Sequence, residues 1–564
     1  MNTTKKSILL VSTAIIAVSS CKNLKLDKNT YTVTPSPLEL VGDSVRVKIE
    51  GIVPAKTFHP KATAVFIPTI KTANGDKPLK TMNLYGAKVK GAQGTMIDWK
   101  TGGKITYTDV VAYTPDMRDA KLVGHIDGKL KSKTKTYNAE LAEATITTQL
   151  LVMNDQKAIM AKDAMPKTTA FTSNADILYT INAEAVRSTE LKAEDMIALD
   201  KFIAEGSTNA YTIKGVSIAS YASPDGIETK NADLATNRGT TAATAVKAMF
   251  KKNKLEAGTQ DGFYTKTATP EDWEGFKELM NQSNIADKDM ILRILTTYPD
   301  LEVREKEMKN ISKAYTELAD DIFPKLRRSK IVINAEKPCK TDEELKQLST
   351  SAPDQLNVEE LLYAANLQSD LTAKANIYKN AETRFVYDFR PSNNLGGVYL
   401  MQNKISDAKS EFEKANKLSP NNKAVQNNLG VIAQVSGDKV AAEAMYKNAA
   451  GAGEEVNRNM ASLQIAKGEY SKAVSNYGAD KSFNAALANL LAGNKDQALS
   501  ILEASKESST AMGYYLKAVI NARMGNATSM LDALKAAINK DASLKTFAKG
   551  DKEFSKFATQ LAGL

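Results

Sequence analysis

Residues 393–420 read NNLGGVYLMQNKISDAKSEFEKANKLSP, and this stretch decides the fold of the carboxyl-terminal part of the chain. Its pattern returns 34 positions later, where Leu395, Gly396, Ala408, Phe412 and Ala415 become Leu429, Gly430, Ala442, Tyr446 and Ala449. Shifted 34 positions back, it meets Leu361, Tyr378 and Ala381, but Lys374 stands where a small residue is expected. A helical pattern with this period indicates stacked helix pairs, so we predict an all-α solenoid over residues 358–564.

The repeated positions resemble those of the tetratricopeptide repeat (TPR). Seven positions that this family fills with the same residue types are occupied by Leu395, Gly396, Tyr399, Ala408, Phe412, Ala415 and Pro420. Later units are shorter and are marked by Gly468, Gly493 and Gly525, which gives about six helix pairs. The resemblance implies a concave face that binds peptides or envelope proteins of unknown identity.

Three asparagines are candidates for lining that face. Asn394, Asn427 and Asn428 lie on the first helices of their expected pairs. An asparagine amide offers both hydrogen-bond donors and acceptors, which suits partner binding. The alternative is that these side chains are simply solvated on a helix surface.

The amino terminus has the pattern of an export signal. Lys5 and Lys6 precede an apolar run from residue 8 to residue 18, which is too short to span a bilayer. Residues 18–21 read VSSC and resemble a lipobox, in which the cysteine is acylated and becomes the first mature residue. The resemblance implies a signal peptide at 1–20 and lipid attachment at Cys21, with durable anchoring by two or three acyl chains.

Strand patterns dominate the next region, which we assign to residues 21–160. Residues 44–50 read SVRVKIE, so apolar and charged residues alternate as they do in a half-buried strand. Similar short runs, separated by Gly, Pro, Asn and Asp, indicate a β-sandwich of immunoglobulin-like type. The sequence does not indicate a ligand for this domain.

A β-α-β-α order follows, in a central domain that we place at residues 166–337. The loop at 221–226 reads YASPDG, and the residues after it include Asn231, Leu234, Ala235 and Arg238. These residues resemble the OmpA-like, peptidoglycan-associated domain, and residues 327–333 (RRSKIVI) look like that family's closing strand. The fold expected for the whole chain is therefore a β-sandwich, an α/β OmpA-like domain and a TPR solenoid.

The resemblance implies a grip on the diaminopimelate of a peptidoglycan stem peptide. Arg238 falls on the family's arginine position, and a guanidinium binds a carboxylate with two parallel hydrogen bonds. Ser223 stands where the family has an aspartate for the ligand amine, and Asn231 is expected to shape the loop. Asp225 either replaces that aspartate or is an ordinary turn residue.

Two further segments complete the domain plan. Residues 270–323 carry helical apolar stripes where the family is usually shorter, and they are reminiscent of enlarged OmpA-like domains in envelope proteins of the Bacteroidota. This helical insertion either packs as an additional core or reshapes the ligand groove. Residues 338–357 are expected to be a linker.

Composition and motifs reduce the number of function classes that fit the sequence. The formal charge is +10, but the 75 basic residues are interleaved with 65 acidic ones, which does not indicate a nucleic-acid partner. The motifs of hydrolases, phosphate-binding loops and metalloproteases are missing from the sequence. The two histidines, His59 and His125, have no metal-ligand cluster beside them, so we expect no metal or cofactor.

The sequence therefore predicts a non-enzymatic lipoprotein of the outer membrane that faces the periplasm. Its OmpA-like domain is expected to dock on peptidoglycan while the TPR array recruits protein partners. One alternative is an accessory subunit of an outer-membrane assembly or transport complex that does not bind peptidoglycan. Another is a surface or fimbria-associated protein.

Overall fold

A computed structural model of the chain describes residues 31–208, 211–224, 228–285, 287–310 and 312–564. Two compact units are present, and the second is inserted into the first. The first unit joins the residues up to Lys162 to Gln368–Leu564, and the second is Asp163–Leu367. Cys21 and the expected signal peptide lie outside the described residues. Within the described ranges, none of the helices combines the length and the apolar character that a bilayer crossing requires.

The first unit begins with two β-sheets that share one hydrophobic core. The four-stranded sheet contains β1 Tyr31–Thr34, β2 Leu40–Val41, β3 Ser44–Val53 and β8 Gly103–Ala112. The six-stranded sheet contains β4 Ala62–Thr72, β5 Gly75–Pro78, β6 Met82–Gly86, β7 Thr95–Ile97, β9 Ala120–Leu130 and β10 Lys133–Ala144.

Strand alternation fixes which side chains enter this core. In β3, Val45, Val47 and Ile49 are buried while the charged residues between them are not, as the pattern predicted. The rings of Phe66 in β4 and Tyr107 in β8 pack edge to face, with their centroids 5.9 Å apart. This aromatic pair bridges the two sheets. The prediction of a sheet-rich amino-terminal region is confirmed.

The second unit is built on a four-stranded sheet of order β11-β14-β12-β13. Its strands are β11 Thr168–Leu178, β12 Thr212–Tyr221, β13 Tyr264–Thr269 and β14 Arg328–Pro338. Only β12 and β13 pair in parallel, because α2 Glu228–Lys252 connects them. Buried residues of α2 and of α1 Glu194–Gly206 share a core with the sheet.

Between β13 and β14 the described residues form five helices. They are α3 Trp273–Gln282, α4 Lys288–Thr297, α5 Leu301–Asn310, α6 Ser312–Asp321 and α7 Phe323–Leu326. Their apolar faces form a separate cluster that includes Phe276 and Phe323, so the insertion packs largely against itself. This favours the core-packing reading of the apolar stripes.

The range expected to be a linker, 338–357, contains a helix. α8 Asp342–Ser351 begins with a capping box between Thr341 and Glu344, and its Leu345 is fully buried. α9 Val358–Asn366 follows, also with a capping box. Capping residues and one buried apolar side chain thus accompany a helix in the range that was expected to be a linker.

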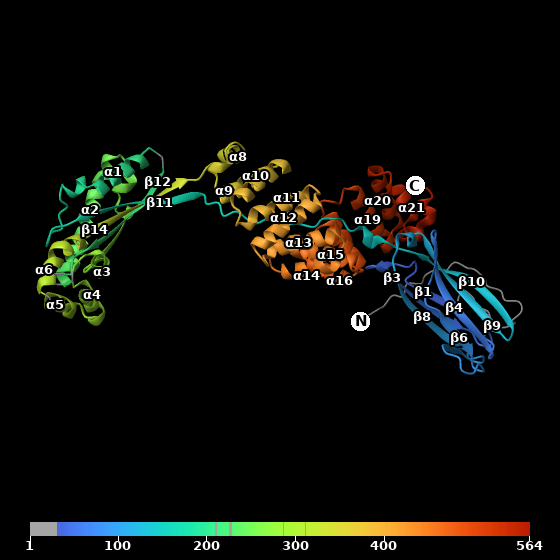
Figure 1. Cartoon of the computed structure of the whole chain (residues 1–564). Helices are drawn as coiled ribbons and strands as arrows, with labels where there is room; N and C mark the ends of the chain where they lie inside the picture. The colour runs from blue at the N-terminus through green and yellow to red at the C-terminus, as the bar shows by residue number, and fades with distance from the viewer. Residues whose placement is uncertain (1–30, 209–210, 225–227, 286, 311) are drawn as a thin grey trace, which may run out of the picture. The chain divides into compact units, whose positions relative to one another are not determined.

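The carboxyl-terminal part of the first unit, residues 368–564, is built of helices, as predicted (Figure 1). After α10 Leu371–Arg384 come five helix pairs: α11 Phe389–Met401 and α12 Ile405–Leu418, α13 Lys423–Val435 and α14 Lys439–Asn448, α15 Glu454–Ala466 and α16 Tyr470–Tyr477, α17 Phe483–Leu491 and α18 Lys495–Glu503, α19 Ala511–Met524 and α20 Ala527–Lys540. The chain ends with α21 Leu544–Gly550 and α22 Ala558–Leu561.

The 34-residue period has a direct packing cause. A Cβ on Gly396 would lie 2.7 Å from the ring of Phe412, and one on Gly430 would lie 2.7 Å from the ring of Tyr446. In each pair the glycine lets the aromatic ring of the second helix lie against the first helix. The helices therefore approach closely enough to bury both faces.

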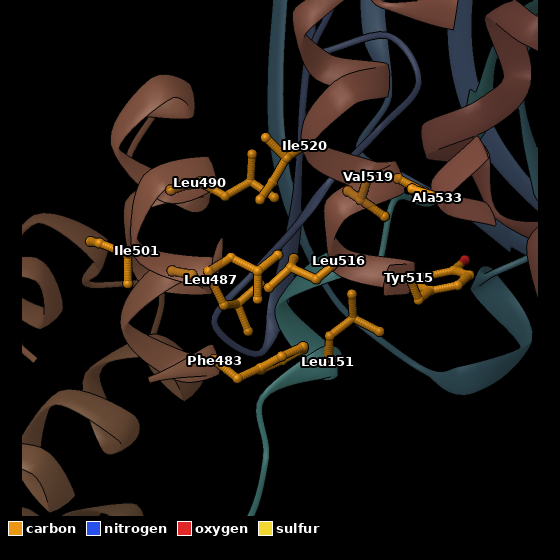
Figure 2. Packing of buried hydrophobic residues seen from close by; sticks show 14 of the residues in the cluster. Leu151, Phe483, Leu487, Leu490, Ile501, Tyr515, Leu516, Val519, Ile520 and Ala533 are labelled. Carbon is orange, nitrogen blue, oxygen red and sulfur yellow. The ribbon is translucent and has the colours of Figure 1, made fainter. Parts of the chain in front are cut away.

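The sandwich and the helices share further contacts within the first unit. Leu151, at the end of the sandwich region, inserts among Phe483, Leu516 and other array residues (Figure 2). Arg523 of α19 forms ion pairs with Glu553 (2.5 Å) and Glu39 (2.6 Å). The chain before residue 163 and the chain after residue 367 are thus held together by apolar and ionic contacts.

One acidic pair in the array makes stability depend on pH. Burial raises the pKa of Glu411 to about 6, the hydrogen bond to Glu382 adds to the shift, and Lys414 opposes it, while the pKa of Glu382 itself is lowered. Because the folded pKa is raised, the stabilisation is complete below about pH 4.5 and is lost as pH rises through about 6. Glu411→Gln should therefore stabilise the unit by about 1 kcal/mol at pH 7.5 and much less at pH 4.5.

Calorimetric unfolding at the two pH values tests this expectation. Glu413→Gln is the matched control, because Glu413 lies on the same helix but is exposed and pairs only loosely with Lys409, at 3.9 Å. A gain at pH 7.5 that the control reproduces would contradict the role given to Glu411.

Candidate peptide-binding groove

An extended segment of the chain lies along the first helices of the array. Residues 153–162, MNDQKAIMAK, have no regular secondary structure, and we call them the strap. None of these ten residues is buried. The strap is nevertheless held by side chains from α11, α13, α15 and α17, which are the first helices of four successive pairs.

Asparagine side chains hold the strap by its backbone. Asn394 accepts from the amide of Ala161 at 2.7 Å and donates to the carbonyl of the same residue at 2.9 Å. Asn428 does the same for Ile159, at 2.7 and 2.9 Å. Each carboxamide thus satisfies both backbone groups of one strap residue.

Asparagines of the next two helix pairs bind the strap in the same way. Asn459 pairs with both backbone groups of Lys157, each at 2.8 Å. Residues 157, 159 and 161 are two apart, and alternate residues of an extended chain present their backbone to the same side, about 6.6 Å apart. The strap then turns at Asp155, whose amide donates to the Met153 carbonyl, and Asn484 pairs with Met153 at 2.8 Å in both directions.

Two more asparagines join the rungs into one network. Asn393 and Asn427 each donate to the strap, to the carbonyls of Ile159 (3.0 Å) and Lys157 (2.9 Å). They also bond to the neighbouring rungs: Asn428 donates to Asn393 and Asn459 donates to Asn427, each at 2.9 Å. All six asparagines are at most 1% exposed. The amides are therefore orientated by one another as well as by the strap. We call Asn393, Asn394, Asn427, Asn428, Asn459 and Asn484 the asparagine ladder.

Side chains of the strap add apolar contacts. Ile159 packs on the cluster that contains Val431, Tyr446 and Val456. Met160 lies against Gly397, where an added Cβ would be 2.4 Å from the methionine sulfur. Gly397 leaves room for this thioether, so the second glycine of the Gly396-Gly397 pair faces the strap while the first faces the partner helix.

Asn394, Asn427 and Asn428 thus bind an extended peptide segment, and this segment is the strap of the same chain. They are buried rather than solvated, which differs from the alternative expectation. Sequence reading missed Asn393, Asn459, Asn484 and the strap. The asparagine pairs 393–394 and 427–428 are separated by 34 residues, as the repeat period predicts. The next intervals are shorter, 31 residues from 428 to 459 and 25 residues from 459 to 484. The 34-residue period therefore does not locate the later asparagines.

Arg238 occupies a different setting in the second unit. Its side chain is 1% exposed, and it donates to the backbone carbonyls of Ala183 (3.0 Å), Tyr221 (2.9 Å) and Thr180 (3.4 Å). The guanidinium thereby ties the segment after β11 to the end of β12. This is a bracing role that sequence reading did not anticipate.

The other residues expected at this site lie beside that brace. Asn231 donates to the Ser223 carbonyl at 3.1 Å. The Ser223 hydroxyl accepts from Arg327 at 3.0 Å. Asp225 lies outside the described residues.

A buried ion pair next to this loop was not predicted. Arg328 bonds to Asp272 at 3.0 Å, and the other carboxylate oxygen of Asp272 caps α3 through the Gly275 amide at 2.8 Å. The two partners are 56 residues apart in sequence, so local patterns carry no signal for the pair. Within the described ranges, acidic, histidine and cysteine side chains form no metal-binding group.

Comparisons with known proteins give only distant likenesses. Neither a protein-family model nor a curated protein matches the chain. Similar solved structures include a tetratricopeptide repeat protein from Parabacteroides merdae, with 16% identity over 38% of this chain and 90% of that chain and a TM-score of 0.28. YrrB, described as a TPR protein with an unusual peptide-binding site, has 20% identity, coverages of 30% and 94% and a TM-score of 0.24. PilW, described as a widely conserved type IV pilus biogenesis factor, has 16% identity, coverages of 36% and 94% and a TM-score of 0.27. These scores are too low to add to what the helix pairs themselves show.

Proposed function

We propose that the chain is a non-enzymatic, lipid-anchored scaffold of the cell envelope. In this proposal Cys21 holds it at the outer membrane with its domains in the periplasm, the central unit docks on peptidoglycan, and the helical array gathers protein partners. The asparagine ladder carries the scaffold role, because it is a row of buried carboxamides arranged for polypeptide backbone. Carboxamides recognise by hydrogen bonding and supply neither a nucleophile nor a general base.

Docking on peptidoglycan rests on the resemblance of the central unit to OmpA-like domains. The observed order β11, α1, β12, α2, β13 supports this part of the proposal, as does the position of Arg238 on α2, the helix that follows the loop. A second candidate is an accessory subunit that does not bind the wall. It is favoured by the three backbone carbonyls that engage Arg238 and by Ser223 at the family's aspartate position.

Co-sedimentation of the full chain with isolated sacculi separates the two candidates. We expect the wild type to sediment, soluble diaminopimelate to compete, and Arg238→Ala to weaken binding at least about tenfold, because a lost charge-assisted hydrogen bond costs roughly 1.5–3 kcal/mol. Arg293→Ala is the control, since Arg293 is an exposed arginine of the same unit. Circular dichroism must show that each variant is folded.

Two outcomes would overturn this assignment. A wild-type chain that stays in solution favours the accessory subunit, and a folded Arg238→Ala variant that still sediments removes Arg238 from the contact. Cell fractionation tests the anchor separately: Cys21→Ser should move the protein out of the membrane fraction, and unchanged membrane association would contradict lipid attachment.

A further inference from the structure

The asparagine ladder is a complete receptor for an extended chain, and its present occupant is a segment of the same protein. We propose that the array binds partner proteins by strap exchange, in which an extended segment of the partner replaces residues 153–162 on the ladder. This inference rests on the scaffold role proposed above and gives the partner a chemical description. It is independent of the wall contact and of the lipid anchor.

The receptor is more firmly built than its occupant. Asn393, Asn427 and their neighbours bond to one another, so the carboxamides keep their orientation when the strap leaves. The strap has no buried residue, and Asn154, Lys157 and Lys162 are exposed. Removal of the strap leaves buried amides without its backbone as a partner, and another extended backbone satisfies them better than a vacancy does.

The strap also shows which sequences the groove accepts. Backbone bonds to residues 157, 159 and 161 are independent of side-chain identity, whereas side chains supply selectivity. The Ile159 side chain meets the apolar cluster, and the unbranched Met160 side chain lies beside Gly397, so these two positions favour apolar residues. The expected partner therefore presents an extended segment with an aliphatic residue followed by a methionine-like residue.

A partner segment must displace a strap that is covalently part of the same chain. A strap joined to the same chain has an effective concentration in the millimolar range, so a free peptide binds the wild type weakly. Ile159→Asp with Ala161→Pro should release the strap, because it places a charge against the apolar cluster and removes the amide that Asn394 accepts. We expect a fluorescent peptide of sequence MNDQKAIMAK to bind this full-length variant at least about tenfold more tightly than the wild type.

Two N-methylated peptides provide a register-specific test. Methylation of the peptide nitrogen at the Ile159 position removes the hydrogen that Asn428 accepts, and we expect at least about a tenfold loss of binding. Methylation at the Met160 position changes a nitrogen that faces away from the ladder, so we expect less than a threefold change. Equal effects of the two methyl groups, or no binding to the folded variant, would overturn strap exchange.

A measurement on the wild type covers the case in which the double variant fails to fold. At millimolar unlabelled peptide, hydrogen exchange in residues 153–162 should accelerate while exchange in the array core stays unchanged. Unchanged exchange in the strap would also overturn the proposal. Neither result depends on sedimentation with sacculi or on Cys21, so failure here is distinct from failure of wall docking or anchoring.

Discussion

Asn428→Ala should destabilise the strap on the array by about 2–4 kcal/mol. The substitution removes both backbone bonds to Ile159 and the bond to Asn393, all between 2.7 and 2.9 Å. The Ile159 amide and the Asn393 side-chain oxygen lose their partner, whereas the Ile159 carbonyl still accepts from Asn393 at 3.0 Å. Each group left unpaired costs roughly 1–3 kcal/mol when it stays shielded from water. Hydrogen exchange of the Ile159 amide, measured by mass spectrometry on the peptide that covers the strap, should accelerate by more than about tenfold.

The matched control is Asn448→Ala. Asn448 is an exposed asparagine at the end of α14 in the same helix pair, and surface substitutions of this kind usually change stability by less than about 0.5 kcal/mol. If both variants exchange at the wild-type rate, the carboxamides do not hold the strap, and the peptide groove loses its physical basis.

Arg523→Met should destabilise the first unit by about 3–5 kcal/mol. Arg523 is the cation between Glu553 and Glu39, and the Glu553 side chain is only 3% exposed. Methionine fills similar space but leaves the Glu553 carboxylate buried with the Thr148 hydroxyl as its remaining close partner. Removing one partner of a buried ion pair is costly because the other charge stays desolvated.

Urea unfolding measures this loss if the two units are read separately. The two tryptophans lie one in each unit, so Trp99 fluorescence in a Trp273→Phe background reports on the first unit. Lys517→Met is the control on the same helix, because its pair with Glu503 is exposed and is expected to contribute less than about 1 kcal/mol. Similar losses for the two variants would show that the contacts of Arg523 are no stronger than those of a surface pair.

Local patterns predicted the elements well because they report on local physics. Alternation in residues 44–50 implies β3, and the recurrence of Gly396 and Phe412 as Gly430 and Tyr446 implies stacked helix pairs. The helix at 342–351 was missed because a short capped helix has too few apolar positions to show a period.

Local sequence patterns located the strands and helices, and they singled out three of the six asparagines of the ladder. That the groove is filled, and by which segment, is seen only in the tertiary contacts. Ile159 and Asn428 are 269 residues apart, and the strap offers its backbone to the ladder. Because every residue has the same backbone groups, such an occupant leaves no signature in the sequence, whereas the asparagines that bind it do. The strap can therefore be recognised as a ligand of the array only from the tertiary structure.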